Sequence, residues 1–198
     1  HEARLGAARV WAKEIHFRIG VHHLRGLIDA GKAGQEYAEL AEAVVAALVP
    51  VVIDDMARRH GPPPGRGLSV LAMGSLGAGR LSSSSDLDLI VIYDADGVEA
   101  SDGRRPLPAR TWYARFTQGL ITALTAPMPD GRLYEVDMRL RPSGRQGPVA
   151  TALPAFRAYQ QDEAWTWEHL ALTRARVIAG EPGLGEEIEA FRRELIAQ

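Results

Sequence analysis

Cysteine is absent from the sequence. Its absence excludes disulfides, zinc–cysteine sites and thiol chemistry, and it fits a reducing compartment. Long apolar runs are absent as well: none approaches the ~20 residues that cross a bilayer, and no signal peptide opens the chain. We therefore expect a cytoplasmic protein without a membrane segment. The first residue is His1 and not Met, so we expect a piece of a longer protein.

An excess of charge of either sign is lacking too. Lys plus Arg is 23 and Asp plus Glu is 25, which leaves a formal net charge of −2. A protein whose main task is to hold a nucleic-acid backbone is normally basic, so we expect no nucleic-acid partner. With 46% hydrophobic residues among 198, the chain can bury the core of one ordinary domain.

Several common catalytic signatures are missing. The segment from Gly74 to Arg80 contains no Gly-Lys-Ser/Thr and is therefore not a P-loop. Gly77 and Gly79 are not followed by the third glycine of a dinucleotide-binding fold. No Gly-x-Ser-x-Gly nucleophile motif occurs. The histidines lack metal-ligand spacing with acids, so we interpret them as surface or core residues.

The N-terminal third of the chain is predicted to be helical. Apolar residues recur at helical spacing from Trp11 onward, and Gly31 and Gly34 are expected to break the pattern. A second helix is expected from Tyr37 to Met56, and Pro50 would kink or divide it.

Beyond a glycine- and proline-rich loop at 61–65, a small sheet is expected. Leu68–Met73 is a short apolar strand, and Asp86–Tyr93 is a second strand whose later half is apolar on both faces. That pattern is typical of a central strand covered on both sides. Leu133–Leu140 alternates strictly and is expected to form a third strand. Further helices are expected at Thr111–Thr125, at Pro154–Ala179 up to Gly180, and from Glu186 onward.

Two carboxylates stand two residues apart at the start of the second predicted strand. Asp86 and Asp88 therefore project from one face, where their charges repel. A cation between them stabilises such a pair, and oxygen ligands favour magnesium or manganese over zinc. Taken alone, an Asp-x-Asp is more often a turn residue followed by an edge charge.

A third carboxylate lies on the third predicted strand. Asp137 shares the polar face of that strand with Glu135 and Arg139. On a strand next to the second one, Asp137 would complete a two-metal site, in which the ions lie ~3.5–4 Å apart. Asp86, Asp88 and Asp137 are thus the candidate catalytic residues and metal ligands.

The order of these residues resembles the DNA polymerase β-like nucleotidyltransferase superfamily. A strand that ends in Gly74-Ser75 is followed after ten residues by Asp86-x-Asp88, and a later strand holds Asp137. The resemblance implies that Gly74 and Ser75 hold a nucleoside triphosphate while the acids bind two Mg²⁺ ions. Gly74 suits that place, because a residue without Cβ lets the backbone approach a phosphate.

Three longer blocks resemble the bacterial glutamine synthetase adenylyltransferases. They are GSLGAGRLSSSSDLDLIVIYD, YEVDMRLRPSGRQGPVAT and YQQDEAWTWEHLALTRARVIAG. Members of that family carry two similar nucleotidyltransferase domains, one that attaches AMP to a tyrosine of glutamine synthetase and one that removes it by phosphorolysis. Two positions depart from the commonest pattern: Ser75 stands where many members have Lys, and Ser82–Ser85 replaces a run that often holds an aromatic residue or Asn.

This resemblance implies a metal-dependent enzyme that uses ATP and Mg²⁺, with Mn²⁺ as an alternative, and glutamine synthetase as its protein substrate. It also implies regulation of the longer protein by a PII-type signal protein and by glutamine. Residues 163–169 (EAWTWEH) resemble the C-terminal, adenylylating half, whereas the removing half tends to a Gly-Arg-Asp-Trp-Glu-Arg type of sequence. We therefore predict AMP transfer to tyrosine with release of pyrophosphate, which would down-regulate nitrogen assimilation.

Three alternatives stay open. The nearest is the removing half, which runs the same geometry backwards with inorganic phosphate. A nucleotidyltransferase with a small-molecule or RNA acceptor is more distant, and the near-balanced charge weakens the RNA version. The third is a regulatory module that binds a nucleotide without catalysis.

Together, pattern and resemblance predict an α+β nucleotidyltransferase fold. A small mixed β-sheet would be flanked by helices, with extra helices at both ends. We divide the chain into an N-terminal helical segment (1–34), a catalytic domain (35–182) and the truncated start of a C-terminal helical region (183–198).

Arginines beside the third acid are candidate phosphate ligands. Arg139 and Arg141 follow Asp137 closely, and guanidinium groups bind phosphate oxygens well. We expect core packing for four large side chains, Met128, Met138, Trp165 and Trp167. The sequence does not choose between a role in the site and a structural or solvated role for Arg80, Arg145, Glu168, Arg174 and Arg176.

Overall fold

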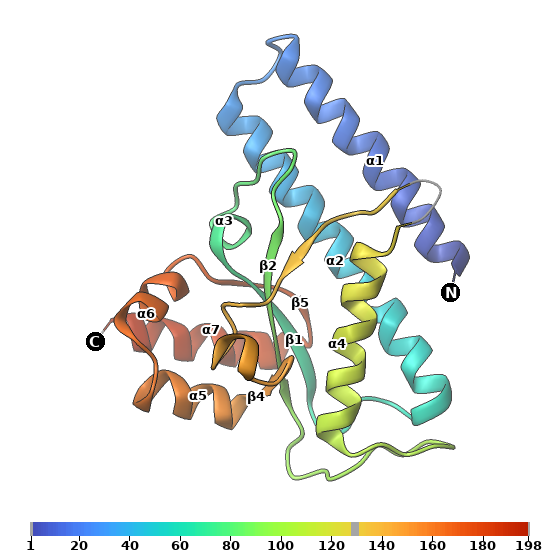
Figure 1. Ribbon diagram of the computed structural model, residues 1–198, viewed down its shortest axis with the longest axis vertical. Helices are drawn as coiled ribbons and strands as arrows, with labels where there is room; N and C mark the ends of the chain where they lie inside the picture. The colour runs from blue at the N-terminus through green and yellow to red at the C-terminus, as the bar shows by residue number, and fades with distance from the viewer. Residues whose placement is uncertain (1, 128–130, 198) are drawn as a thin grey trace.

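The protein forms one mixed sheet between two groups of helices (Figure 1). The computed structural model describes residues 2–127 and 131–197. The helices are α1 (Glu2–Leu24), α2 (Ala30–His60), α3 (Gly74–Gly77), α4 (Ala109–Thr125), the 3-10 turn η1 (Gly144–Gln146), α5 (Leu153–Asp162), α6 (Thr166–Leu172) and α7 (Pro182–Ile196). The strands are β1 (Gly67–Ala72), β2 (Leu87–Asp94), β3 (Val136–Asp137), β4 (Ala150–Ala152) and β5 (Arg176–Gly180).

β2 lies at the centre of this sheet. The strand order is β3-β2-β1-β5, and β4 also pairs with β2. β1 is antiparallel to both β2 and β5, whereas β3 and β4 run parallel to β2. The predicted α+β fold with a small mixed sheet flanked by helices is therefore confirmed.

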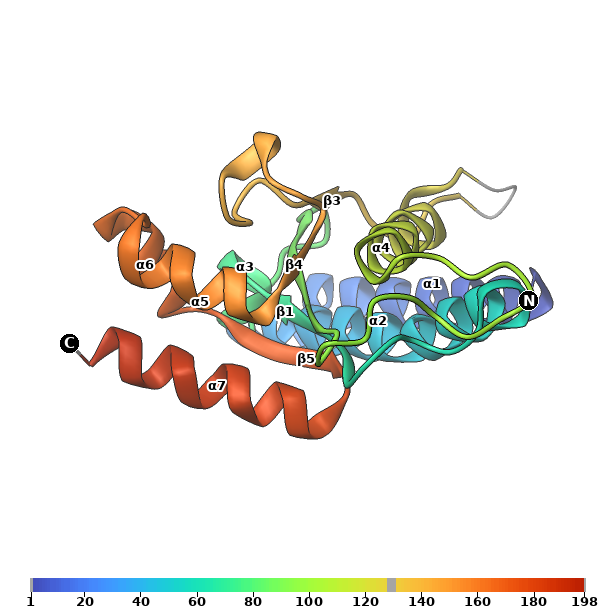
Figure 2. The ribbon, with the colours of Figure 1, turned by 90° about the horizontal axis from the view of Figure 1, so that it is seen from below.

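Both faces of β2 are covered, as its apolar sequence predicts. Leu87, Leu89 and Val91 face the larger core, which contains buried residues of α1, α2 and α4. Ile90 and Ile92 face the smaller core, built with α5, α6 and α7. Figure 2 shows α7 along one side of the sheet and α1, α2 and α4 toward the other. Because strand residues alternate between faces, Asp88 points to the side of the smaller core.

The break between the first two helices lies earlier than predicted. Gly31 and Gly34 are inside α2, which begins after Asp29, and the carboxylate of Asp29 accepts a hydrogen bond from Lys32 N at 2.7 Å. This N-cap satisfies an amide that the helix itself cannot. α2 is also not divided at Pro50. Ten buried residues along α2 pack into the core, and that packing outweighs a proline defect of ~3 kcal/mol.

The predicted strand Leu133–Leu140 is wrong in length. Only Val136–Asp137 pairs with β2, because the amides of Leu133 and Tyr134 bond to the carbonyl of Leu124 at the end of α4. A strand that was not predicted, β4, occupies the rest of that edge of β2, with Val91 opposite Ala150.

The predicted helix Pro154–Ala179 is also wrong. This stretch forms two helices, α5 and α6, with a break at 163–165, and strand β5 follows them. Gly180 therefore ends a strand and not a helix. β5 forms because β1, which is buried from Leu68 to Ala72, offers it a free edge, and Val177 and Ile178 pack on opposite cores. The final helix α7 is confirmed, although it begins at Pro182 and not Glu186.

The ends of the chain pack on the same body as the sheet. Ala12 and Ile19 of α1 are buried in the larger core, and Leu184 and Ile188 of α7 in the smaller one. No helix within the described residues is long and apolar enough to cross a membrane. The division at 34/35 and 182/183 stays a prediction.

Candidate active site

A tight turn at the end of β1 brings the glycine-rich segment against the first acids. The amide of Met73 donates to the carbonyl of Asp88 at 2.8 Å, and the single-turn helix α3 then begins at Gly74. Gly74 has a φ of +56°, and a Cβ there would lie 2.4 Å from Oδ2 of Asp88. Glycine adopts this conformation without strain, and its lack of a Cβ permits this close approach.

Two of the three acids lie side by side on neighbouring strands. β2 and β3 pair in parallel, with Leu87 opposite Val136 and Asp88 opposite Asp137. Asp86 is exposed and lies one residue before β2. The short piece of β3 that forms is thus the piece that aligns Asp137 with Asp88.

The charges at this place are only partly compensated. The pKa of Asp88 is raised, chiefly by burial and then by the negative charges of Asp137 and Asp86, while Arg139 acts in the opposite direction. The pKa of Asp137 is lowered, chiefly by its hydrogen bond from Arg139. Repulsion among carboxylates is the electrostatic condition that a bound cation relieves.

Arg139 holds both oxygens of Asp137. Its backbone N donates to Oδ1 at 2.8 Å and its Nε to Oδ2 at 2.6 Å. Among residues 2–127 and 131–197, no three His, Cys, Asp or Glu side chains are arranged as a metal-ligand group.

The donor set nevertheless fits a hard divalent cation. All three candidate ligands are carboxylates, which suit Mg²⁺ or Mn²⁺. Asp88 lies against the backbone of Gly74, so a phosphate near this glycine would share the cation with it. Metal binding by Asp86, Asp88 and Asp137 stays a prediction.

Comparisons with known proteins identify the family of the chain. Residues 1–191 match the model of a family described as glutamate-ammonia ligase adenylyltransferase. Glutamate-ammonia ligase is the systematic name of glutamine synthetase. The chain belongs to this family.

Three curated relatives carry the name bifunctional glutamine synthetase adenylyltransferase/adenylyl-removing enzyme. The chain is 52% identical to the protein from Xanthobacter autotrophicus over 189 residues, 94% of this chain and 19% of that protein. It is 49% identical to the one from Mesorhizobium japonicum over 199 residues (100% and 20%), and 47% identical to the one from Brucella suis over 197 residues (99% and 20%). The chain thus spans about a fifth of the length of these relatives.

In this adenylyltransferase-family chain, Ser75 and Arg141 differ in their freedom to meet a ligand. Ser75 is exposed, and its hydroxyl makes no hydrogen bond within the described residues. Arg141 is half-buried and donates to the carbonyls of Met138 at 2.8 Å, Arg145 at 3.2 Å and Gly147 at 3.3 Å. Arg141 therefore braces the loop after β3, and its nucleotide-binding role stays a prediction.

The predicted core packing of the two tryptophans is wrong. Trp165 is 72% exposed and Trp167 57%, because α6 is a short peripheral helix that buries only Leu172. Met138 is buried, as predicted, and Met128 lies outside the described residues. The sequence left the role of Glu168 open, and the structure gives it a structural one. Its carboxylate accepts hydrogen bonds from Trp165 N and from the hydroxyl of Tyr159, both at 2.8 Å.

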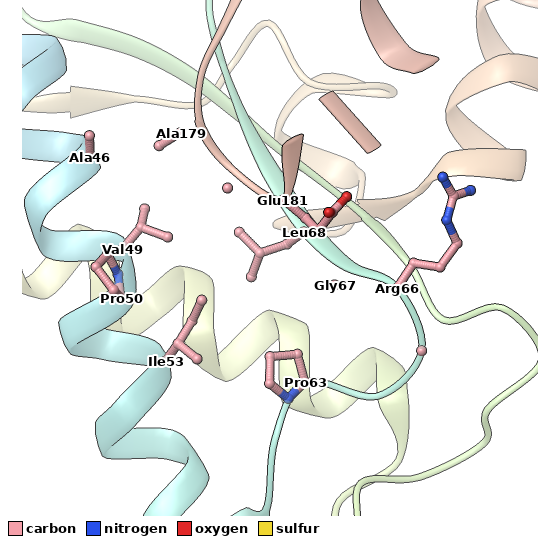
Figure 3. A pocket seen from close by; sticks show the side chains of 12 residues that line it. Ala46, Val49, Pro50, Ile53, Pro63, Arg66, Gly67, Leu68, Ala179 and Glu181 are labelled. Carbon is pink, nitrogen blue, oxygen red and sulfur yellow. The ribbon is translucent and has the colours of Figure 1, made fainter. Parts of the chain in front are cut away.

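Two sizeable cavities lie away from the acids. An apolar cavity of about 630 Å³ is bounded by α2, β1 and the end of β5, with Val49, Ile53 and Leu68 on its wall (Figure 3). A polar cavity of about 700 Å³ lies between the start of α2 and residues 77–80. Of the described residues that line them, none is Asp86, Asp88 or Asp137. The candidate acids therefore lie outside both of these cavities.

Sequence reasoning missed one pair of residues near the glycine-rich segment. Arg176 of β5 forms an ion pair with Glu42 of α2 and contacts the carbonyls of Leu76 and Gly77. These residues are 134 positions apart in the chain, so only the fold brings them together. Arg176 fell in a region predicted as helix, where its partners could not be inferred.

Proposed function

We propose that this chain transfers AMP from ATP to a tyrosine of glutamine synthetase, with release of pyrophosphate. The observation that supports the proposal best is the pairing of Asp88 with Asp137 beside the backbone of Gly74, in a chain of the glutamate-ammonia ligase adenylyltransferase family. A regulatory module without catalysis would have no need for adjacent carboxylates that repel.

In this proposal, Gly74 and Ser75 bind the triphosphate through backbone and hydroxyl, and Asp86, Asp88 and Asp137 hold two Mg²⁺ ions, for which Mn²⁺ could substitute. Bound magnesium neutralises phosphate charge and lowers the pKa of the attacking hydroxyl. The tyrosine oxygen bonds to the α-phosphorus as the bond from that phosphorus to the β-phosphate's bridging oxygen breaks. Asp137 accepts the tyrosine's proton, for which it must first leave Arg139, since that contact lowers its pKa.

The test supplies the chain with unmodified glutamine synthetase, Mg²⁺ and ATP labelled in its α-phosphate. Label on the synthetase is expected with the parent chain and not with Asp86→Asn. A near-normal rate of AMP transfer by Asp86→Asn would contradict the proposal. Carried out in parallel with unlabelled phosphate and adenylylated synthetase, the same assay distinguishes the removing half, which would release ADP. An acceptor screen with RNA and small alcohols covers the more distant alternative.

The remaining partners belong to the longer protein. The relatives' names mention glutamine synthetase, and the family resemblance adds a PII-type signal protein and glutamine as regulators. We propose that these regulators act on the longer protein and not at the acids, and that the reaction takes place in the cytoplasm. Addition of each regulator to the transfer assay tests the first point.

Arg139 gives a further prediction. Its exposed guanidinium neutralises Asp137 in the absence of ATP, and we propose that it moves to the triphosphate when ATP binds. Arg139→Met should raise KM for ATP roughly 10-fold, the value of one charge-assisted hydrogen bond. It should also tighten Mg²⁺ binding without ATP, because Asp137 is then free. Isothermal titration with Mg²⁺ measures this.

The matched control is Arg132→Met. Arg132 is exposed, lies in the segment that leads into β3, and pairs with Glu135. Its loss should leave both Mg²⁺ binding and KM for ATP unchanged. Equal Mg²⁺ affinity in Arg139→Met and the parent chain would contradict the role given to Arg139.

A further inference from the structure

The glycine-rich segment 74–80 lies between two parts of the chain that are distant in sequence. A Cβ on Gly77 would lie 1.9 Å from the carbonyl oxygen of Arg174, just before β5, and 2.7 Å from that of Ala72. At the other end of the segment, the amide of Leu81 donates to the carbonyl of Gly34 in α2 at 2.9 Å. The backbone just before β5 and the backbone of α2 therefore both hold the segment.

One guanidinium links these parts. Nη1 of Arg176 donates to Oε2 of Glu42 at 2.9 Å, and Nη2 donates to the other oxygen of the same carboxylate. The same group reaches the segment: Nε lies 3.5 Å from the carbonyl oxygen of Gly77 and Nη2 lies 3.4 Å from that of Leu76. A planar guanidinium with five N–H donors can serve both carboxylate oxygens and two carbonyls together, four acceptors for which an ammonium group has only three donors.

One side of the segment borders a polar cavity, although the side chain of Leu76 is buried in the larger core. The polar cavity of about 700 Å³ is lined on one side by Gly77, Ala78, Gly79 and Arg80, and on the other by residues that include Glu42. Close packing resists displacement, so on its cavity side the segment has fewer contacts that resist a shift than on its buried side. Across this cavity, Arg176 is the connection from α2 to the carbonyls of the segment.

The contact at 76–77 is transmitted to the start of α3. The amide of Gly77 donates to the carbonyl of Met73 at 2.9 Å, and that of Ala78 to the carbonyl of Gly74 at 3.1 Å. α3 is a single turn, so its two ends cannot move independently. The position of the Leu76 and Gly77 carbonyls therefore sets the position of Gly74, which touches Asp88.

We propose that Arg176, oriented by Glu42, is a positioning residue for nucleotide binding. It fixes the end of α3 and so fixes the Gly74-Ser75 backbone against which the triphosphate lies. This inference rests on the proposed function, since it takes that backbone as the phosphate site. It gives α2, which contributes none of the candidate acids, a part in substrate binding.

The kinetic test compares Arg176→Met, Glu42→Gln and the control Arg174→Met in the AMP-transfer assay. Arg174 is exposed two residues away, so the control removes the same charge without the contacts. Arg176→Met should lower kcat/KM for ATP roughly 10- to 100-fold, mainly through KM, because a misplaced binding group costs about that much. Glu42→Gln should give a smaller change in the same direction, and Arg174→Met none. Arg176→Lys keeps the positive charge but not the forked guanidinium. Its kcat/KM for ATP should therefore lie between those of Arg176→Met and the parent chain.

A second readout does not depend on activity. Hydrogen exchange at the amides of 77–80 should become faster in Arg176→Met than in Arg174→Met, while β2 exchanges as in the parent chain. The inference is overturned if Arg176→Met matches the control in KM and in exchange. It is also overturned if exchange rises throughout β2 and kcat falls with KM unchanged, since Arg176 would then only stabilise the fold. Failure of the proposed function shows differently, as absence of AMP transfer by the parent chain.

Discussion

Asp88→Asn should reduce AMP transfer about 1,000-fold, because the metal-bound transition state loses several kcal/mol of charge stabilisation. Asp88 is the acid at which the other features meet: it pairs with Asp137, lies against Gly74 and accepts a hydrogen bond from Met73. Asparagine has nearly the same shape and keeps the backbone contacts, so the loss should come from charge alone. The initial rate of label transfer to glutamine synthetase measures it.

The same substitution should not destabilise the fold. Burial and the charges of Asp137 and Asp86 disfavour the ionised form of Asp88 and raise its pKa, so removal of that charge relieves repulsion. We expect Tm of Asp88→Asn to equal or exceed that of the parent chain. Mg²⁺ should raise Tm of the parent chain and not of the variant.

Asp102→Asn is the matched control for this experiment. Asp102 is exposed in the loop that follows the far end of β2, so its loss should leave transfer and the response to Mg²⁺ unchanged. A drop in Tm together with activity in Asp88→Asn would instead indicate that Asp88 supports the fold.

Gly74→Ala should reduce AMP transfer about 100-fold, the cost of misplacing a catalytic group. Alanine would adopt a φ of +56° and place its Cβ 2.4 Å from Oδ2 of Asp88, so the carboxylate has to turn away. The strained backbone should also lower the free energy of unfolding by about 1–2 kcal/mol. Transfer rates and urea unfolding are measured on the same preparation.

Gly97→Ala separates the two effects. Gly97 has a φ of +75° in the loop after β2, and a Cβ there meets no atom within 4 Å. The free energy of unfolding of Gly97→Ala should therefore fall about as much as that of Gly74→Ala, while Gly97→Ala retains full transfer activity. Equal activity in the two variants would contradict the close contact between Gly74 and Asp88 as a requirement of the reaction.

Alternation and turn chemistry were enough to predict how the backbone places two of the candidate acids. The apolar later half of β2 indicated a strand covered on both faces, and this fixes the face on which Asp88 lies. The residues 73–75 marked a strand end with a glycine, and the structure gives Gly74 the positive φ that such a turn requires. Asp137 was placed on a neighbouring strand, and its partner there is Asp88.

Elements that depend on distant partners could not be predicted. Arg176–Gly180 was predicted as the end of a long helix although Val177 and Ile178 favour strands, and it becomes a strand because β1 has a free edge. Residues 133–134 have a strand pattern but bond to Leu124, which no local pattern encodes. Trp165 and Trp167 were expected in the core because they are large and hydrophobic. In the described part of the chain, however, no other layer of structure covers these side chains, and both are exposed. The pairing of Arg176 with Glu42 is non-local in the same way.

The most direct measurement is a crystal structure of the chain with a non-hydrolysable ATP analogue and Mg²⁺. We predict oxygens of Asp86, Asp88 and Asp137 within about 2.0–2.1 Å of magnesium. We also predict the triphosphate against Gly74 and Ser75, with Arg139 released from Asp137. Magnesium and triphosphate bound elsewhere, for example in the polar cavity beside Arg80, with the Arg139–Asp137 pair intact, would contradict these predictions.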